Sequence, residues 1–465
     1  MKNLTLILFM FTSTIAFSQS SEKNIIDAIM KTYNDKDYAA FYHLISPNFK
    51  TQITENNLKD FLSENLFANY GEIKSIIFKN KKQEQKIYTT QFEKGKLDLT
   101  LIFNNEFKID GLSFTPPKAE IIVKKSFLTN NKMESKLDSI VDVVIKPFIQ
   151  NSINSGISIG IIQNGETKFY HYGETKKETA NLPNNNTIYE IGSISKTFTG
   201  YLLAQAIADK KINLDDDIRK FLAQKYLNLE FEGNPIQIKH LINHTSTLPR
   251  IPENLDKQTN YDEENPYVNY SKEMISDYLK NYTIKSKPGI TQEYSNFGTA
   301  LLGIILENVY KKTYSNLLQT YITKPFKMKN TFENINKFQK INFATGYNDK
   351  GVETKHWDLI NFVAAGGIKS TIEDMIIYLQ QNIDETNTNI KLSHNIIFSK
   401  ENQSNGFAWV INKTKDDNTF IWHNGGTFGF TSFFGFIKEK KYGIVVLNNS
   451  GLSVDSVAIS ILKKL

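Results

Sequence analysis

The most informative segment of this chain reads Glu190-Ile191-Gly192-Ser193-Ile194-Ser195-Lys196-Thr197-Phe198-Thr199-Gly200. Apolar residues at Ile194, Phe198 and Leu202 recur at a four-residue interval, which predicts a helix with one buried stripe. Residues three apart on a helix are neighbours, so Lys196 can lie beside the hydroxyl of Ser193. An activated nucleophile needs this geometry. Taken alone, the pair also fits a helix N-cap serine followed by a solvated lysine.

Two later segments carry residues of the same chemical kind. Residues 288–296 end in Tyr294-Ser295-Asn296, a Y-x-N just before an apolar helix, where a loop can present side chains into a cleft. Residues 422–427 contain His423-Asn424-Gly425-Gly426, an H-x-G-G at the end of a predicted strand. Two glycines there allow a substrate to approach the backbone closely. A nucleophile, a tyrosine and a glycine-lined strand edge therefore follow one another along the chain.

The elements around these motifs predict an antiparallel sheet interrupted by a large helical insertion. Residues 156–163 and 166–172 form a predicted hairpin around a two-residue Asn164-Gly165 turn. Further strands are predicted at residues 406–412, 418–422, 430–437 and 442–447, before a closing helix from Val454. Between the two sets of strands, helical patterns cover residues 194–208, 216–222, 238–243, 272–279, 298–310, 314–321 and 372–380.

The N-terminal part of the chain predicts a separate α+β module. Helical patterns between Ile25 and Leu66 precede short, partly alternating segments at residues 74–78, 86–92, 97–103 and 107–114. Pro116-Pro117-Lys118 opens a connection that we interpret as a linker. The predicted organisation is a leader at residues 1–18, a small module at 19–115, a linker at 116–131 and a larger domain at 132–465.

The first residues predict export. Lys2, an apolar run over residues 4–17 and the small residues Ala16 and Ser18 are typical of a secretory signal peptide. The run is shorter than the roughly 20 residues that span a bilayer, so no membrane span is expected once the leader is removed. A periplasmic or a secreted protein would carry the same leader. The chain has no cysteine, so we expect neither disulfides nor a lipid-modified cysteine.

The composition excludes several other classes of protein. Hydrophobic content of 40% and charged content of 22% are those of an ordinary globular protein. The net charge of +6 is thinly spread, and its densest basic run, residues 79–86, includes Glu84. We interpret that run as a solvated face and expect no nucleic-acid partner.

With the three motifs in this order, residues 133–465 resemble the serine β-lactamase and penicillin-binding protein superfamily, specifically its class C-like branch. His244-Thr245-Ser246-Thr247-Leu248-Pro249 also stands where relatives usually read HTSGLP. The resemblance implies an α+β fold, with a β-lactamase/transpeptidase-like antiparallel sheet flanked by helices and a large helical insertion. The preceding small α+β module resembles NTF2-like or cystatin-like modules.

The resemblance also implies a role for each motif residue. Ser193 would attack a carbonyl and form an acyl-enzyme, with Tyr294 and Lys196 jointly accepting its proton. Both side chains have ordinary pKa values of about 10, so the sequence cannot choose between the two proton routes. Asn296 would hydrogen-bond the substrate amide or Lys196. The backbone N–H groups of Ser193 and Gly426 would form the oxyanion hole, and Gly425 would contribute to substrate binding.

His423 departs from the lysine that lactamases of this branch carry. Imidazole is mostly neutral at pH 7, so we expect weaker recognition of a substrate carboxylate and assign His423 to substrate binding. His240 and His244 have the i, i+4 spacing of a metal pair, but the H-E-x-x-H glutamate is absent. No metal or cofactor is expected. We expect His244 to anchor the turn around Ser246 and Pro249.

The predicted function is that of an exported serine hydrolase cleaving an amide, peptide or ester bond, either D-Ala-D-Ala carboxypeptidase-like or esterase-like. The substrate would be a small molecule or a peptide, with the cell wall as one source. Two alternatives remain open: a class C-like β-lactamase, and a non-catalytic protein that binds cell-wall peptides or a partner. The loops between the motifs, such as residues 250–285, set the specificity and cannot be derived from the sequence.

Overall fold

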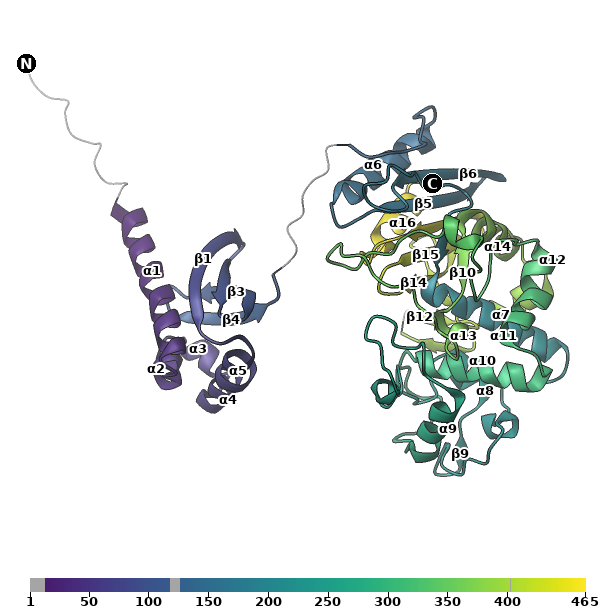
Figure 1. Cartoon of the computed structure of the whole chain (residues 1–465), viewed down its shortest axis with the longest axis horizontal. Helices are drawn as coiled ribbons and strands as arrows, with labels where there is room; N and C mark the ends of the chain where they lie inside the picture. Colours follow the sequence, from purple (N-terminus) through teal and green to yellow (C-terminus); the bar gives the residue numbers. More distant parts are fainter. Residues whose placement is uncertain (1–12, 118–125, 402) are drawn as a thin grey trace, which may run out of the picture. The chain divides into compact units, whose positions relative to one another are not determined.

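The computed structural model describes residues 13–117, 126–401 and 403–465, with side chains from residue 22 onward. The chain divides into two compact units, residues 1–120 and 121–465, which are described separately (Figure 1). Most of the predicted leader at residues 1–18 lies outside the described residues, as do residues 118–125 of the predicted linker. Among the described residues, no helix is long and apolar enough to cross a membrane.

The first unit packs short helices against a four-stranded antiparallel sheet of order β1-β2-β3-β4, as predicted. Its core includes Tyr33, Phe41, Leu62 and Leu99, all fully buried. The elements are α1 (Ser13–Asn34), α2 (Tyr38–His43), α3 (Pro47–Lys50), α4 (Glu55–Asp60), η1 (Phe61–Phe67), α5 (Ala68–Tyr70), β1 (Ile73–Lys82), β2 (Gln85–Phe92), β3 (Gly95–Phe103) and β4 (Ile109–Thr115).

The second unit is built on an eight-stranded antiparallel sheet of order β11-β12-β13-β14-β15-β16-β5-β6. The predicted hairpin β5–β6 pairs with β16, so the beginning and the end of the domain meet in one sheet, with Gly160 opposite Val445. The strands are β5 (Gly156–Gln163), β6 (Glu166–Gly173), β11 (Phe398–Lys400), β12 (Gln403–Asn405), β13 (Val410–Lys413), β14 (Thr419–Gly426), β15 (Thr431–Ile437) and β16 (Tyr442–Asn448).

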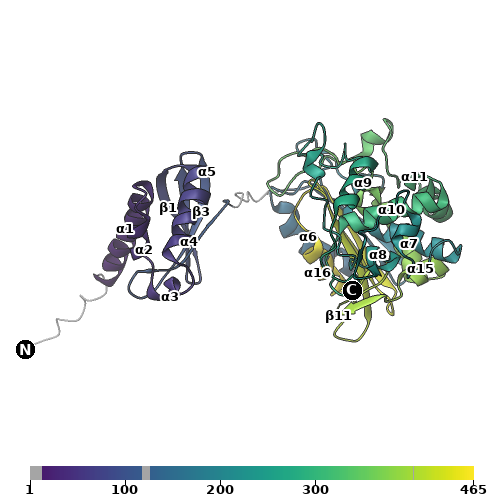
Figure 2. The ribbon, with the colours of Figure 1, turned by 90° about the horizontal axis from the view of Figure 1, so that it is seen from below.

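Helices cover both faces of this sheet, which explains why its central strands are continuously apolar. Successive residues point to opposite faces: Ile444 packs into one buried cluster and Val445 into the other. The helices α6 (Lys136–Gln150) and α16 (Asp455–Leu462) cover one face. On the other face α14 (Ile372–Asp384) lies so close that a Cβ atom on Gly160 would come within 2.4 Å of Ile376. Figure 2 shows the strands between these two groups of helices.

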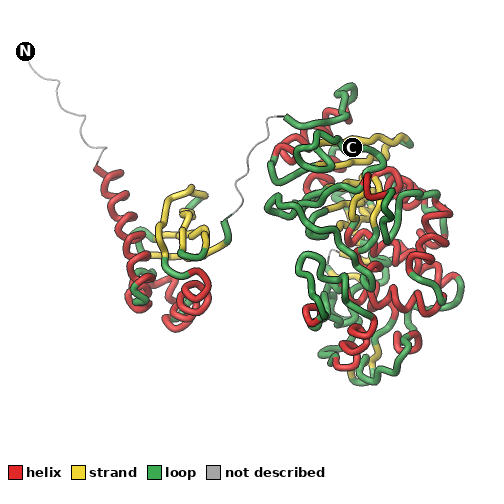
Figure 3. The backbone as a smooth tube through the Cα atoms, in the orientation of Figure 1, coloured by secondary structure: helices red, strands yellow, loops and turns green. Residues whose placement is uncertain are grey.

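The helical insertion lies between β6 and β11, and Figure 3 shows its helices and long loops beside the strands. The insertion also contains four short strands that the sequence did not predict: β7 pairs with β10, and β8 pairs with β9. Its principal elements are β7 (Ile188–Glu190), η2 (Gly192–Ile194), α7 (Ser195–Ala208), η3 (Ile218–Phe221), β8 (Glu230–Phe231), β9 (Asn234–Pro235), α8 (Ile238–Ile242), α9 (Lys272–Asn281), α10 (Asn296–Tyr310), α11 (Tyr314–Leu318), η5 (Gln319–Thr323), α12 (Lys324–Phe326), α13 (Val363–Gly366), β10 (Lys369–Thr371) and α15 (Thr388–Ser393).

Three sequence predictions were wrong in detail. The helix α7 is buried on nearly all sides and not along one stripe, because it packs against α10, α13 and α15 at the centre of the unit. Residues 216–222 form only the short 3₁₀ turn η3. Residues 406–412 are not one strand, because a turn closed by a hydrogen bond from the Gly406 N–H to the Trp409 carbonyl separates β12 from β13.

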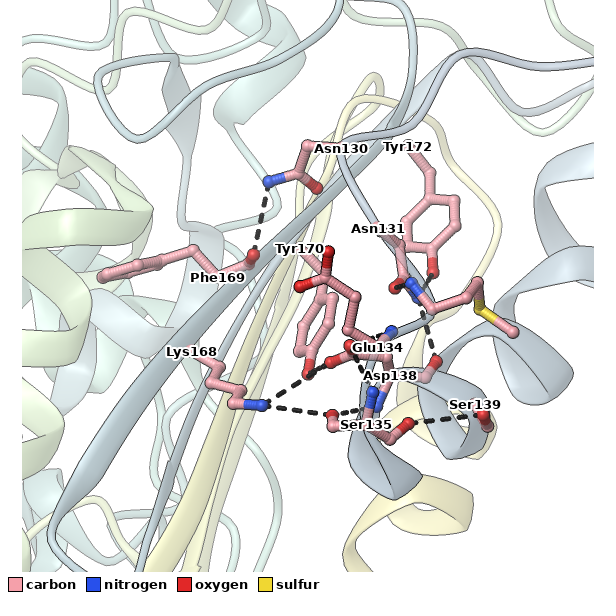
Figure 4. Close-up of polar contacts among 11 residues, drawn as sticks. Asn130, Asn131, Glu134, Ser135, Asp138, Ser139, Lys168, Phe169, Tyr170 and Tyr172 are labelled. Atoms are coloured by element: carbon pink, nitrogen blue, oxygen red, sulfur yellow. Dashed lines mark hydrogen bonds and ion pairs between the residues drawn. The ribbon is translucent and has the colours of Figure 1, made fainter.

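The last residues of the predicted linker belong structurally to the second unit. Thr129 bridges to Tyr172 on β6, and the Asn131 amide donates to the Tyr172 hydroxyl (2.7 Å) and to the Asp138 carbonyl (2.9 Å) (Figure 4). Beside this contact, Ser135 and Asp138 form a capping box at the start of α6. These hydrogen bonds hold the chain in place where it enters the domain. The residue pattern of the linker did not predict them.

Candidate active site

Ser193 lies on the short turn η2 between β7 and α7. The pairing of β7 with β10 holds this turn from one side, and the Ile191 N–H donates to the Ile368 carbonyl (3.2 Å). The Ser193 hydroxyl lies 3.0 Å from the Lys196 amine. Ser195 cannot serve in its place, because its hydroxyl is buried and accepts the Ile368 N–H (3.1 Å).

Lys196 is fully buried, and its amine has three oxygen neighbours. Besides the Ser193 hydroxyl, these are Asn296 Oδ1 at 2.8 Å and the Ala365 carbonyl at 2.6 Å. Burial, with a smaller contribution from the charge of Arg250, lowers the pKa of Lys196 well below its ordinary value. A neutral amine donates to the two carbonyl oxygens and accepts the O–H of Ser193. This arrangement prepares the amine to take up the serine proton.

Tyr294 lies beside the same amine, but its pKa is shifted in the opposite direction. The Lys196 Nζ lies 4.8 Å from the centre of the phenol ring. Burial raises the pKa of Tyr294 to about 12, although Ser193 and Arg250 oppose the shift. The phenol therefore keeps its proton at neutral pH. Of the two routes that the sequence left open, the lowered pKa of Lys196 and the raised pKa of Tyr294 favour Lys196 as the proton acceptor and Tyr294 as a proton donor.

The glycines of β14 bring the strand edge against the nucleophile turn. A Cβ atom on Gly425 would lie 2.1 Å from the Ile191 carbonyl, and one on Gly192 would lie 2.5 Å from the Gly426 nitrogen. Only glycine permits this approach, and Gly192 also has a φ of +51°. The crossing brings the backbone nitrogens of Ser193 and Gly426, the predicted oxyanion donors, close together.

His423 is buried on β14 next to these glycines. Its Nδ1 lies 2.5 Å from the Asn424 carbonyl, so this nitrogen carries the hydrogen. Burial, followed by the charge of Lys196, lowers the pKa of His423 to about 4. The imidazole is therefore neutral at physiological pH and supplies no cation to a substrate.

Two small cavities lie in the site, one at Tyr294 and one at Ser193. One, of about 240 Å³, is lined by His244, Gln292, Tyr294, Gln403, Asn405, Ala408, Val410 and His423. The other, of about 20 Å³, lies at Ser193 and is lined by Tyr267, Asn296, Trp357, Leu359, Phe362, Ala365, Gly366, Gly426 and Thr427. Phe428 is 44% exposed and packs edge-on against Trp357 (4.6 Å between ring centres). The site offers polar amides on one side and aromatic walls on the other.

The structure also brings in residues that sequence reasoning did not place in the site. His244 packs its ring against Tyr294 (4.4 Å between centres) and accepts the Ser295 N–H (3.3 Å), so its role as an anchor of the Ser246 turn was too narrow. Ala365 and Arg250 lie outside the three motifs from which the site was predicted. Thr247, which replaces the customary glycine, adopts a left-handed φ of +63° and keeps the loop in the conformation that glycine would favour.

The paired histidines form no metal site. His240 Nδ1 accepts the Gln237 N–H (3.1 Å) at the start of α8, whereas His244 faces Tyr294. Among the described residues there is no group of three histidine, cysteine or acidic side chains arranged to hold a metal ion.

Glu190 is a buried acid directly before the nucleophile turn. Its Oε1 accepts the Trp357 N–H (2.7 Å) and so connects β7 to the aromatic wall of the site. Burial raises the pKa of Glu190 to about 7, although the charge of Lys369 opposes the shift. The folded state therefore binds a proton that the unfolded chain releases between pH 4.5 and 7, and stability falls as the pH rises through this window.

We expect Glu190→Gln to remove this pH dependence, because glutamine keeps an acceptor for the Trp357 N–H and carries no charge. At pH 8 the variant should be more stable than the wild type by about 3 kcal/mol, and the two proteins should converge at pH 4.5. Calorimetric unfolding of the full chain at both pH values measures the difference. A difference that is the same at both pH values would show that Glu190 is ionised in the folded protein throughout.

A family model described as Beta-lactamase matches residues 141–461. The chain belongs to the beta-lactamase family. A second model, described as a protein of unknown function (DUF3887), matches residues 27–112 and so covers the first unit. The predicted superfamily is confirmed, and the extra N-terminal module is compatible with the second match.

Individual members of the beta-lactamase family are related over the same domain. Protein flp of Staphylococcus aureus (strain N315) is 30% identical over 333 residues, which are 69% of this chain and 64% of that protein. A beta-lactamase of Providencia stuartii is 25% identical over 355 residues, covering 68% of this chain and 87% of that protein. The chain thus spans about 64% of the length of the flp relatives that it matches.

Solved structures confirm the predicted fold of this beta-lactamase domain. A class C beta-lactamase superposes with a TM-score of 0.62 and 26% identity, covering 72% of this chain and all of that one. A beta-lactamase/D-alanine carboxypeptidase from Pseudomonas syringae gives a TM-score of 0.62 at 23% identity over 71% of this chain and 99% of that one, which supports the fold alone.

Proposed function

We propose that the second unit is a serine hydrolase that cleaves an amide, peptide or ester bond of a small-molecule or peptide substrate through an acyl-enzyme on Ser193. The contact between the Ser193 hydroxyl and the buried Lys196 amine, 3.0 Å long, carries this proposal. Serine is a weak nucleophile by itself, and a neutral amine at hydrogen-bond distance is the base that it needs.

In the proposed reaction, Ser193 transfers its proton to Lys196 and its oxygen attacks the substrate carbonyl. The N–H groups of Ser193 and Gly426 stabilise the oxyanion, and a donor of this kind typically contributes about 3 kcal/mol to the transition state. Tyr294 passes a proton to the leaving group and recovers one from Lys196. Water then cleaves the acyl-enzyme by the same proton route in reverse. Asn296 holds Lys196 in place through its Oδ1.

The neutral His423 favours a peptidase or esterase over a dedicated β-lactamase. A lactamase of this branch holds the substrate carboxylate with a permanent cation, whereas burial keeps the imidazole of His423 uncharged. The names of the relatives favour the second candidate, a class C-like β-lactamase, because several are beta-lactamases. We further propose that the protein is exported, on the basis of the predicted leader, and that its substrate derives from the cell wall.

Intact-protein mass spectrometry tests the assignment. We expect a fluorophosphonate to add one adduct to the wild-type chain, mapping to Ser193, and no adduct to Ser193→Ala. A penicillin then separates the two candidates: a long-lived adduct is expected of a peptidase and rapid turnover of a lactamase. A folded protein that neither reagent labels would contradict the hydrolase proposal and favour a non-catalytic binding protein.

A further inference from the structure

The chain contains only two arginines, Arg219 and Arg250, although lysine and arginine together number 55. Arg219 has a structural role, because it forms ion pairs with Asp217 (2.7 Å) and Glu230 (2.8 Å). Arg250 is exposed, and within the described part of the chain its guanidinium forms no ion pair or hydrogen bond. One of two arginines in a lysine-rich chain is thus left unpaired beside the candidate active site.

The position of Arg250 is fixed by its backbone. Its carbonyl accepts the N–H groups of Asn296 (3.0 Å) and Phe297 (3.2 Å), which fastens the loop to the start of α10. The guanidinium carbon lies 5.0 Å from the centre of the Tyr294 ring, and the Lys196 amine lies 4.8 Å from the same centre. The guanidinium and the amine beside the nucleophile therefore both lie within 5.0 Å of the centre of the same phenol ring.

No other cation in this part of the site is free to meet a substrate. Lys196 is buried and surrounded by three oxygens, and the His423 imidazole is neutral. The described residues that line the two cavities include no lysine, arginine, aspartate or glutamate, and Arg250 lies outside both lists, over the Tyr294 ring that lines the larger cavity. A planar guanidinium with free N–H donors is the side chain best suited to grip a carboxylate through two parallel hydrogen bonds.

We propose that Arg250 binds a carboxylate of the substrate and so selects anionic esters or amides over neutral ones. The inference rests on the proposed hydrolase function and narrows its substrate class. Arg250 lies on a different loop from His423, so the proposed carboxylate site is separate from the one that a permanent cation at position 423 would form.

The test compares two esters of equal chain length, mono-4-nitrophenyl glutarate, which carries a carboxylate, and 4-nitrophenyl valerate, which is neutral. We expect the wild type to prefer the glutarate, and Arg250→Gln to lower the ratio of the two kcat/KM values by about 30-fold. Arg250→Lys keeps the positive charge but lacks the two parallel N–H donors of the guanidinium. This variant should retain part of the preference for the glutarate ester. Salt should weaken the wild-type preference, because it screens an exposed charge. Arg219→Gln removes the other arginine as a matched control and should leave the ratio unchanged.

A ratio that stays the same in Arg250→Gln would overturn the proposal, as would an equal fall for both esters, which indicates a structural role. A second measurement does not require turnover: calorimetric binding of the glutarate ester to Ser193→Ala and to Ser193→Ala/Arg250→Gln. Binding that disappears only in the double variant supports the carboxylate site, even if the wild type hydrolyses neither ester and the hydrolase proposal fails. Equal binding by both variants overturns the carboxylate-site proposal and leaves the hydrolase proposal standing.

Discussion

Replacing Ser193 with alanine is expected to reduce ester or amide hydrolysis by about 10⁴-fold or more. The hydroxyl is the only atom at this position that can form the acyl-enzyme, and the remaining oxyanion donors and cavities retain only a small part of the rate enhancement. The change deletes a single oxygen from a half-buried side chain, so the fold should persist. Turnover of a chromogenic ester by the full chain measures the effect.

Ser195→Ala is the matched control for this variant. Ser195 is two residues away on the same turn, and its hydroxyl accepts the Ile368 N–H. Its loss should lower stability by about 1 kcal/mol while turnover persists. Comparable activity in Ser193→Ala and wild type would mean that Ser193 is not the nucleophile. Loss of activity only in Ser195→Ala would indicate that Ser195 is the nucleophile and would refute the assignment of Ser193.

Lys196→Arg is expected to reduce kcat by about 10²- to 10⁴-fold, the range typical of removing a general base. Arginine can still hydrogen-bond Asn296, but its guanidinium carries a permanent positive charge and does not lose a proton in proteins, so it cannot act as a base. In the wild type the rate should rise as the pH passes upward through the pKa of Lys196, because the amine becomes a base only when deprotonated. Burial lowers this pKa, so the rise should be complete well below the ordinary pKa of lysine. The pH–rate profile of Lys196→Arg should lack this rise.

Tyr294→Phe separates the two proton routes. With Lys196 as the base, this variant loses rate because the leaving group has no proton donor, but the rise of the rate with pH remains. The pKa of Tyr294 is raised to about 12, so a phenolate base would require a rise at far higher pH. A rise that disappears in Tyr294→Phe and survives in Lys196→Arg would reverse the two roles.

The sequence predicted the fold well where hydrophobic periodicity was strong. The hairpin over residues 156–173 and the strands at 431–437 and 442–448 form as expected, because β-branched and aromatic residues bounded by turn residues leave few alternatives. The sequence failed where a short element exists only through its partner. The three-residue strand β7 has no signal of its own and is defined by pairing with β10, about 180 residues later in the chain.

The sequence by itself determined the family and the order of the motifs, and it predicted Ser193, Lys196 and Tyr294 as the site residues, because these depend on residue type and on local spacing. Only the tertiary structure decided which of the paired groups holds the proton. The pKa of Lys196 is lowered because the fold buries the amine, which hydrogen-bonds Asn296 and Ala365, 100 and 169 residues away. A pKa depends on desolvation and on neighbouring charge, and neither is a property of the sequence around the titrating group. In the same way, only the tertiary structure shows that Arg250 lies over the Tyr294 ring, where it can contact a substrate.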